Sequence, residues 1–337
     1  MKKSNVKIIA EAGVNHNGSL NMALKLIDAA ASSGADFVKF QHTNPDNVTA
    51  KAPLVDYQKS KKVENQKKMI QKFHLNWRKA YPILIKRANQ KKIKFMQSFF
   101  SASDYISARK YKLKYVKLPS SDLINTPLLE EVGKDNKKVF LSTGMANLNE
   151  IKDAIKVLIK SGTQKKNIVV FHCVSSYPTP ISRINLNSIP FLRKKLNLPI
   201  GFSDHTKDLF AAAIALTLEC KIFEKHFTLD KKLKGPDHKL SLNVQELKDF
   251  IFNLKNYSRV FGKYEKKCLD IEKQAKQATR QSIHAKKNIK KGELFTSDNI
   301  VIRRPSDGIL PSLYKKILNT KAIRNFKIEE PIKNIKF

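Results

Sequence analysis

The chain has 337 residues, of which 41% are hydrophobic, and its 65 lysine and arginine residues against 29 aspartate and glutamate residues give a formal net charge of +36. This apolar content is enough for a full core and excludes a disordered polycation. Because no apolar run approaches the ~18 residues that a membrane helix needs, we expect a soluble protein with no membrane partner.

The positive charge comes mainly from lysine, with 55 lysines and 10 arginines spread over the whole chain. Proteins that read nucleic acids tend to use arginine forks at phosphates and base edges. We therefore favour a solvated lysine-rich surface and expect no specific nucleic-acid partner. A nucleic-acid binder is the alternative from another class of protein, and steeply salt-dependent RNA binding would favour it.

The cysteines and the first residues of the chain indicate the cellular compartment to expect. Cys173, Cys220 and Cys268 are odd in number and widely spaced, so neither a disulfide framework nor a zinc ribbon fits. The first apolar run ends at Ala10, before Glu11, and is too short for a signal-peptide core. We expect a cytoplasmic protein with reduced thiols.

Short apolar, β-branched runs alternate with longer helical patterns through most of the chain, as in βα units around a parallel sheet. The predicted strands are Val6–Ala10, Asp36–Phe40, Ile93–Gln97, Tyr115–Leu118, Val139–Leu141, Ile168–His172, Ile200–Phe202 and Ile222–Glu224. The predicted helices include Leu20–Ser32, Trp77–Gln90, Asn149–Ser161, Leu209–Glu219 and a last one over Val244–Phe261. Eight strands with seven crossovers predict an α/β fold, the (β/α)₈ TIM barrel.

Three further segments complete the organisation of the chain. His42–Leu75 is unusually long for a connection, and loops of that length are often lids or binding loops. Glu265–Ala278 is charged and periodic and predicts a linker helix, after which short strands and turns begin. We divide the chain into a barrel domain (1–265), a linker (266–279) and a small domain (280–337).

Polar and ionisable side chains follow the predicted strands, where the catalytic loops of such a barrel arise. His205 and His226 close the seventh and eighth strands, so two imidazoles could reach one divalent ion, such as Mn²⁺, Fe²⁺, Co²⁺ or Zn²⁺. A hydrogen-bonded structural histidine is the alternative for each. Glu11, Glu224 and His172 are candidates for a third ligand or a general base.

Lys39 and Lys117 end the second and fourth strands. A lysine directed into a barrel mouth is costly to leave unpaired, so it binds an anion, forms a Schiff base or meets a carboxylate. A structural pair of Lys39 with Glu11 is one alternative. We favour capture of a phosphate or carboxylate, because neutral donors converge on the same region. These donors are Ser98, Ser120, Ser203 and the backbone around Ser142–Gly144.

A set of motifs in one order resembles the sialic acid synthase family. The motifs are IIAEAGVNHNGS (8–19), GADFVKFQ (34–41), LSTGM (141–145), HCVSSYPTP (172–180), GFSDHT (201–206), EKHFTLD (224–230), GPDHKLS (235–241) and KKGELFTSDNIVIRRP (290–305). The resemblance implies a TIM barrel followed by a small antifreeze-like (SAF) domain. It also implies condensation of phosphoenolpyruvate with an N-acetylated hexosamine aldose, which gives a nine-carbon sugar acid and phosphate.

The resemblance also implies roles for particular residues. His205 and His226 would hold a catalytic divalent metal, usually Mn²⁺, with Mg²⁺ and Co²⁺ as alternatives, and Glu11 would act near the attacking carbon or the water. Phosphoenolpyruvate would be held by Lys39, Ser98, Lys117, Ser120 and Ser203, and the sugar would be lined by Gln41, Tyr177 and Asp237. Arg304 would reach the sugar's acetamido group in a neighbouring subunit's barrel, which implies a domain-swapped homodimer.

The exact sugar stays open at this point. N-acetylmannosamine would give N-acetylneuraminate, and 2,4-diacetamido-2,4,6-trideoxymannose would give N,N'-diacetyllegionaminate. Pseudaminic acid synthase and a Schiff-base aldolase that uses Lys39 or Lys117 are alternatives. The motifs depart from the family pattern at QSFF (97–100), PSSD (119–122) and RPSDG (304–308), which bears on substrate preference.

Overall fold

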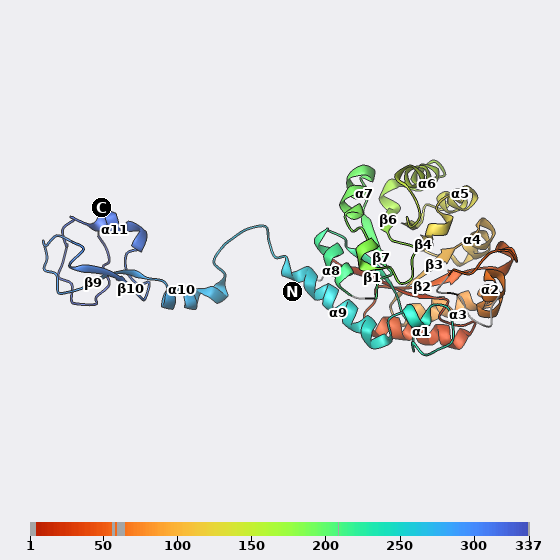
Figure 1. Ribbon diagram of the computed structural model, residues 1–337, viewed down its shortest axis with the longest axis horizontal. Helices are drawn as coiled ribbons and strands as arrows, with labels where there is room; N and C mark the ends of the chain where they lie inside the picture. The colour runs from red at the N-terminus through yellow and green to blue at the C-terminus, as the bar shows by residue number, and fades with distance from the viewer. Residues whose placement is uncertain (1–4, 56–57, 59–64, 208, 336–337) are drawn as a thin grey trace. The chain divides into compact units, whose positions relative to one another are not determined.

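The computed structural model describes residues 5–55, 58, 65–207 and 209–335, which fall into two compact units, Met1–Gly262 and Lys263–Phe337. In the first unit eight parallel strands follow one another around a closed barrel, and β8 pairs with β1 to complete the ring (Figure 1). The strands are β1 (Lys7–Gly13), β2 (Phe37–His42), β3 (Lys94–Phe99), β4 (Tyr115–Leu118), β5 (Lys138–Ser142), β6 (Ile168–His172), β7 (Ile200–Asp204) and β8 (Ile222–His226). The predicted TIM barrel is confirmed.

Several strands extend two or three residues beyond their predicted carboxyl ends. Glu11 pairs in register with both Lys39 and His226, although the sequence pattern placed Glu11 and His226 after the strands. The reason is that polar side chains end the apolar pattern while their backbone groups continue the ladder of hydrogen bonds. The functional side chains near these strand ends are therefore carried by the sheet itself.

Side chains that face the barrel interior form two layers, because alternate residues of a strand point to the same side. Ile9 precedes Glu11 on this face of β1, and Phe37 precedes Lys39 on β2. The lower layer is an apolar cluster made of Ile9, Phe37, Met96, Phe140, Val169 and Phe171. Gly201 makes room for it, since a Cβ there would lie 2.7 Å from Cζ of Phe171. The upper layer is polar and forms the floor of the site.

Helices surround the barrel and cover the larger hydrophobic core (Figure 1). They are α1 (Leu20–Ser32), α2 (Gln66–Phe73), α3 (Trp77–Gln90), α4 (Ala102–Ala108), α5 (Thr126–Lys134), α6 (Leu148–Lys160), α7 (Ser188–Leu196), α8 (Phe210–Thr217) and α9 (Val244–Val260). Asn147 and Asn243 begin α6 and α9 with capping boxes. In the part of the chain that the structure describes, no helix is long and apolar enough to cross a membrane.

The long connection after β2, for which we expected a lid or a binding loop, is partly helical. Its described residues include the helix α2, which begins at the capping side chain of Asn65. Residues 56–57 and 59–64 of the predicted lid lie outside the described residues.

The second unit has its own small core of buried residues, among them Ile283, Phe295 and Phe326. Its two strands, β9 (Ser282–Ala285) and β10 (Ile300–Arg303), pair antiparallel, and α11 spans Tyr314–Ile317. The predicted linker helix is shorter than expected, because only α10 (Lys273–Thr279) is α-helical after a 3₁₀ turn over Asp270–Glu272. A short polar helix without a buried face gains little from packing, which accounts for the difference.

Candidate active site

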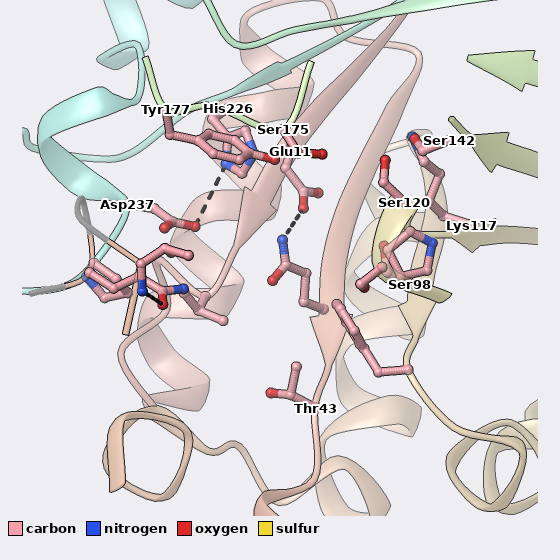
Figure 2. A pocket seen from close by; sticks show the side chains of 18 of the residues that line it. Glu11, Thr43, Ser98, Lys117, Ser120, Ser142, Ser175, Tyr177, His226 and Asp237 are labelled. Carbon is pink, nitrogen blue, oxygen red and sulfur yellow. Dashed lines mark hydrogen bonds and ion pairs between the residues drawn. The ribbon is translucent and has the colours of Figure 1, made fainter. Parts of the chain in front are cut away.

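A pocket of about 830 Å³ opens at the carboxyl ends of the barrel strands (Figure 2). It brings together most of the predicted site residues of the barrel, although they come from six strands and the loops that follow. These residues are Glu11, Lys39, Gln41, Ser98, Lys117, Ser120, Tyr177, Ser203, His205, His226 and Asp237. Arg304, in the second unit, is exposed.

The floor of the pocket begins with a buried contact between β1 and β2. Nζ of Lys39 lies 2.9 Å from Oε1 of Glu11 and donates a hydrogen bond to Oγ of Ser98 over 2.9 Å. The pairing with Glu11 that the sequence left as an alternative is thus present. Gln41 donates to the same Glu11 oxygen over 2.8 Å. Oε2 of Glu11 is buried without a hydrogen-bond partner among the described residues.

The second lysine of the floor is held from the opposite side of the barrel. Nζ of Lys117 donates to Oε2 of Glu224 over 2.8 Å, and Nζ of Lys39 lies 3.7 Å from the other Glu224 oxygen. Ser203 donates to that oxygen over 3.0 Å. Burial opposes ionisation of Glu224, but the two ammonium groups outweigh it and hold the pKa of its carboxyl at about 2. Glu224 is therefore ionised and bridges both lysines.

Two other carboxyls of the pocket have raised pKa values. Burial raises the pKa of Glu11 although Lys39 opposes the shift, and burial together with the nearby charge of Glu11 raises the pKa of Asp237 to about 7. Gly13 lies between them, since a Cβ there would fall 3.3 Å from Oδ2 of Asp237 and 3.5 Å from Oε1 of Glu11. A carboxyl with a pKa near neutrality can donate or accept a proton at physiological pH.

Neutral donors line the side of the pocket above Lys117. Gly144 donates its backbone N–H to Oγ of Ser120 over 3.0 Å, and Ser120 also lies 3.2 Å from Sγ of Cys173. A Cβ at Gly144 would meet Oγ of Ser175 and Oγ of Ser120, so a larger residue there would displace these hydroxyls. Together with the lysines, these groups can bind a phosphate or carboxylate.

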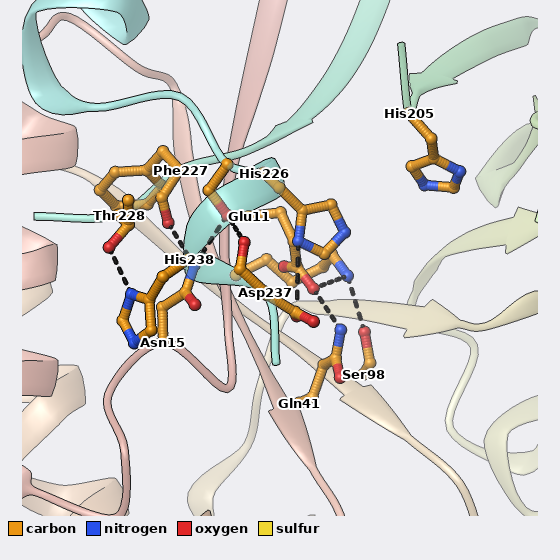
Figure 3. Close-up of polar contacts among 12 residues, drawn as sticks. Glu11, Asn15, Gln41, Ser98, His205, His226, Phe227, Thr228, Asp237 and His238 are labelled. Atoms are coloured by element: carbon orange, nitrogen blue, oxygen red, sulfur yellow. Dashed lines mark hydrogen bonds and ion pairs between the residues drawn. The ribbon is translucent and has the colours of Figure 1, made fainter. Parts of the chain in front are cut away.

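The two predicted imidazoles lie directly after β7 and at the end of β8, with ring centroids 5.8 Å apart (Figure 3). The ring of Tyr177 lies 4.1 Å from that of His205 and 5.8 Å from that of His226. Burial lowers the pKa of His205 to about 4, and burial followed by the charges of His205 and Lys39 lowers the pKa of His226 well below its usual value. Both rings are therefore neutral at pH 7, the form that binds metals.

The surroundings of these rings fit a metal site with two protein ligands. Nδ1 of His205 bonds the carbonyl of Val174 over 2.7 Å, a contact that fixes the tautomer in many metal sites, and Nε2 lies 3.3 Å from Oγ of Ser203. Nδ1 of His226 is buried without a hydrogen-bond partner among the described residues and lies 3.7 Å from Oδ2 of Asp237. No group of three or more His, Cys, Asp or Glu side chains in the described residues is arranged to hold an ion.

One candidate residue from the sequence lies outside the pocket. His172 is not in the pocket, because its side chain packs on Phe202 and its Nε2 lies 2.8 Å from the carbonyl of Ile184. It alternates with the inward Phe171, which directs it to the helical layer.

Sequence reasoning also missed an apolar wall of the pocket, made by Met69, Ile70 and Phe73 of α2 and by Phe100 after β3. The available signal was the amphipathic pattern of residues 66–73 within the long connection.

The fold and the pocket together define an enzyme that acts on a small anionic substrate. The model of the NeuB family matches residues 26–266, and that of the SAF domain matches residues 280–336. The chain is 42% identical over 336 residues to the N,N'-diacetyllegionaminic acid synthase of Campylobacter jejuni, covering 99% of this chain and 100% of that one. It is 30% identical to a pseudaminic acid synthase of the same species, over 97% of this chain and 95% of the relative.

A solved structure agrees with these relatives. The N-acetylneuraminic acid (sialic acid) synthetase of Leptospira borgpetersenii, in complex with citrate, matches with a TM-score of 0.70 and 30% identity, over 80% of this chain and 90% of that one. The protein belongs to the NeuB family of sialic acid synthases, and its small domain is a SAF domain. The resemblance in the sequence motifs is thereby confirmed.

Proposed function

We propose that the protein condenses phosphoenolpyruvate with an N-acetylated hexosamine aldose and water, and releases a nonulosonic acid and phosphate. The observation that carries this proposal is one pocket in which two buried lysines and several hydroxyls lie below two neutral imidazoles. C3 of phosphoenolpyruvate forms a bond to the aldehyde carbon, C2 takes up water, and cleavage of the C–O bond releases phosphate.

Phosphoenolpyruvate binds to the polar floor in this proposal. Lys39 and Lys117 supply the charge for its phosphate and carboxylate, and Ser98, Ser120 and Ser203 supply neutral donors. Both ammonium groups are already held by carboxylates, so they are positioned before the substrate arrives. Preorganised donors stabilise developing charge without reorganising, which is the main electrostatic contribution to catalysis in many enzymes.

His205 and His226 would hold a divalent metal ion, for which we propose Mn²⁺, with Mg²⁺ and Co²⁺ as alternatives. When bound, such an ion polarises the aldehyde oxygen as a Lewis acid. The neutral state of both rings supports this assignment, as does Nδ1 of His226, which has no hydrogen-bond partner in the described part of the chain.

The two carboxyls with raised pKa values supply the proton transfers. The aldehyde oxygen must gain a proton to become a hydroxyl, and the attacking water must lose one. Glu11 and Asp237 approach each other across Gly13 at the wall of the pocket. We assign the water side to Glu11, beside Lys39, and the sugar side to Asp237, beside His226.

For the sugar we propose 2,4-diacetamido-2,4,6-trideoxymannose, so that the product is N,N'-diacetyllegionaminate. This aldose has a methyl group at C6 and a second acetamido methyl where N-acetylmannosamine has hydroxyls. Met69, Ile70, Phe73 and Phe100 offer an apolar surface to such methyl groups. The amide of Asn47 is already bonded to Ser101 and Asp104, so it does not offer its donors to a hydroxyl. The Campylobacter jejuni relative supports the same product.

We also propose that Arg304 contacts the sugar's acetamido group in the barrel of a second subunit, within a domain-swapped homodimer. Arg304 lies on an exposed turn of the second unit. Ser282, on β9, holds this turn, because its hydroxyl donates to the carbonyl of Pro305 over 2.7 Å and accepts from the N–H of Gly308 over 3.0 Å.

The test is incubation of the Mn²⁺-loaded protein with phosphoenolpyruvate and each aldose in turn, with product mass and released phosphate as readouts. We expect N,N'-diacetyllegionaminate and one phosphate per product. A stereoisomeric diacetamido aldose, supplied separately, tests the pseudaminic acid synthase alternative.

Burial lowers the pKa of Lys117 although Glu224 opposes the shift, so a Schiff base on this residue is the second candidate. Borohydride trapping of pyruvate on the protein would favour that aldolase.

A further inference from the structure

We propose that Asp204 and Lys225 are a positioning pair that sets the spacing of His205 and His226. The inference rests on the proposed metal site. Each member of the pair is the chain neighbour of one imidazole, and the two residues are register partners in the ladder between β7 and β8. Figure 3 shows the two imidazoles, His226 at the end of β8 and His205 directly after β7.

The ion pair between Lys225 and Asp204 is buried, and its charged atoms lie close together. Nζ of Lys225 lies 2.8 Å from Oδ2 of Asp204 and donates a second hydrogen bond to the carbonyl of Thr206 over 2.6 Å. The side chains of Lys225 and Asp204 are 3% and 0% exposed. Lys225 on β8 therefore holds the residues on both sides of His205.

The other oxygen of Asp204 closes the turn that carries His205. Oδ1 accepts from the backbone N–H of Thr206 over 2.9 Å and from its hydroxyl over 2.8 Å. His205 itself is fixed by two contacts to the loop after β6. Its Nδ1 bonds the carbonyl of Val174, and its carbonyl accepts from the N–H of Thr179 over 2.9 Å. The ring and the carbonyl of His205 are thus held by the loop after β6, and its two chain neighbours are held by Lys225.

Strand alternation explains why this pair acts on the imidazoles from behind. Ser203 and Glu224 face the barrel interior, so Asp204 and Lys225, the next residues, face the surrounding helices. The pair is thus separate from the anion floor. A buried ion pair adds little net stability compared with apolar residues of similar size, because desolvation of both charges is costly. Its geometric effect on the two ring-bearing strand ends is the more specific contribution.

Such a pair matters because metal binding is sensitive to small displacements. Two imidazole nitrogens must each approach the ion to ~2.1 Å, and residues that orient metal ligands typically change affinity 10- to 100-fold when mutated. With only two protein ligands from the described residues, no third protein ligand compensates for a shift of β7 against β8.

The experiment compares Lys225→Met, Asp204→Asn and the double variant with wild type, in the full metal-stripped protein. Mn²⁺ affinity is measured by titration calorimetry and by loss of the free-ion paramagnetic resonance signal. We expect each single variant to bind Mn²⁺ roughly 10- to 100-fold more weakly. The Michaelis constant for phosphoenolpyruvate should stay within about twofold, because the floor is intact. Lys231→Met, in the solvent-exposed pair with Glu246, is the matched control and should leave Mn²⁺ affinity unchanged.

The double variant separates positioning from stability. Since it buries no unpaired charge, we expect it to unfold at a higher urea concentration than Lys225→Met while its Mn²⁺ affinity stays low. Wild-type Mn²⁺ affinity in the folded variants would overturn the pair's role and leave the proposed function standing. A wild-type protein that binds none of Mn²⁺, Co²⁺ and Mg²⁺ would overturn both the metal site and the pair.

Discussion

Lys117 and Glu224 face each other across the barrel, on β4 and β8, and are joined by a hydrogen bond of 2.8 Å between Nζ and Oε2. The ammonium group also lies 4.2 Å from the centre of the Phe171 ring. The contact therefore ties opposite walls of the barrel together at the boundary between the apolar and polar layers. It also holds one of the two lysines that we assign to phosphoenolpyruvate.

Glu224→Gln tests the energetic importance of this contact. Removal of one partner leaves a buried ammonium group without its countercharge, so we expect the free energy of unfolding to fall by about 3 kcal/mol. Urea unfolding at neutral pH measures it. Glu219→Gln is the control, because Glu219 forms a pair with Arg193 in which its side chain is 74% exposed, and we expect a change below about 0.5 kcal/mol. If both variants lost the same free energy of unfolding, burial would not be what makes the contact between Lys117 and Glu224 important.

His226→Ala tests the metal site. We expect the purified variant to lose stoichiometric Mn²⁺ binding and nearly all product formation, because one of two protein ligands is absent. In wild type, EDTA should abolish activity and Mn²⁺ should restore it. His74→Ala, which removes an exposed imidazole, should retain both properties. Full turnover by metal-stripped His226→Ala would refute the assignment.

Two buried histidines outside the site predict a pH dependence of stability. Burial, with a smaller contribution from the charge of His74, lowers the pKa of His16 to about 4 and that of His42 to about 3, from 6.5. Below pH 6.5 the unfolded chain binds protons that the folded chain does not, so stability falls as the pH falls from 6.5 towards these values. Each histidine should account for about 2 kcal/mol between pH 6.5 and pH 5.

The measurement is urea unfolding of wild type and His42→Gln at pH 7 and at pH 5. The variant should lose roughly half of this histidine contribution, so its stability should change less between the two pH values. His74→Gln should change the pH dependence only slightly, because burial is the larger cause of both lowered pKa values and the charge of His74 the smaller one. An identical pH dependence for His42→Gln and wild type would show that His42 is not kept neutral by folding.

Ile70→Asn tests the apolar wall. We expect wild type to favour the trideoxy aldose over N-acetylmannosamine in kcat/KM by 10-fold or more, and the variant to lower this ratio by roughly 10-fold, since one methylene contributes 10- to 200-fold discrimination in such pockets. Ile70→Val keeps the surface apolar and should keep the ratio. Ile83→Asn makes the same change on the exposed side of α3 and should also keep it. An unaltered ratio in Ile70→Asn would remove this wall from the determinants of specificity.

Mixed dimers test the role of Arg304. His226→Ala and Arg304→Ala should each be nearly inactive with the sugar at low concentration. If the arginine acts in the partner's barrel, a heterodimer contains one intact site, so mixing by co-expression should restore about a quarter of wild-type activity. Activity no higher than that of the separate variants would place the arginine in its own barrel or remove it from the site.

The sequence predicted the barrel because each strand is a short apolar run, and it located the imidazoles because both follow such runs. It did not indicate the bridge from Lys117 to Glu224, since these residues are 107 positions apart and meet only when the barrel closes. Asp204 and Lys225 were hidden for a related reason. Their pairing depends on strand register, which periodicity does not determine. The wall formed by α2 was missed because its amphipathic pattern covers only residues 66–73 within a long connection.

The aromatic rings of the lower layer, Phe37, Phe140 and Phe171, close the barrel below the lysines. The pocket is therefore closed at this end, so both reactants enter and leave at the carboxyl ends of the strands. In the proposed arrangement phosphoenolpyruvate lies deepest. We therefore expect phosphoenolpyruvate to bind before the sugar, and the nine-carbon product to leave before phosphate.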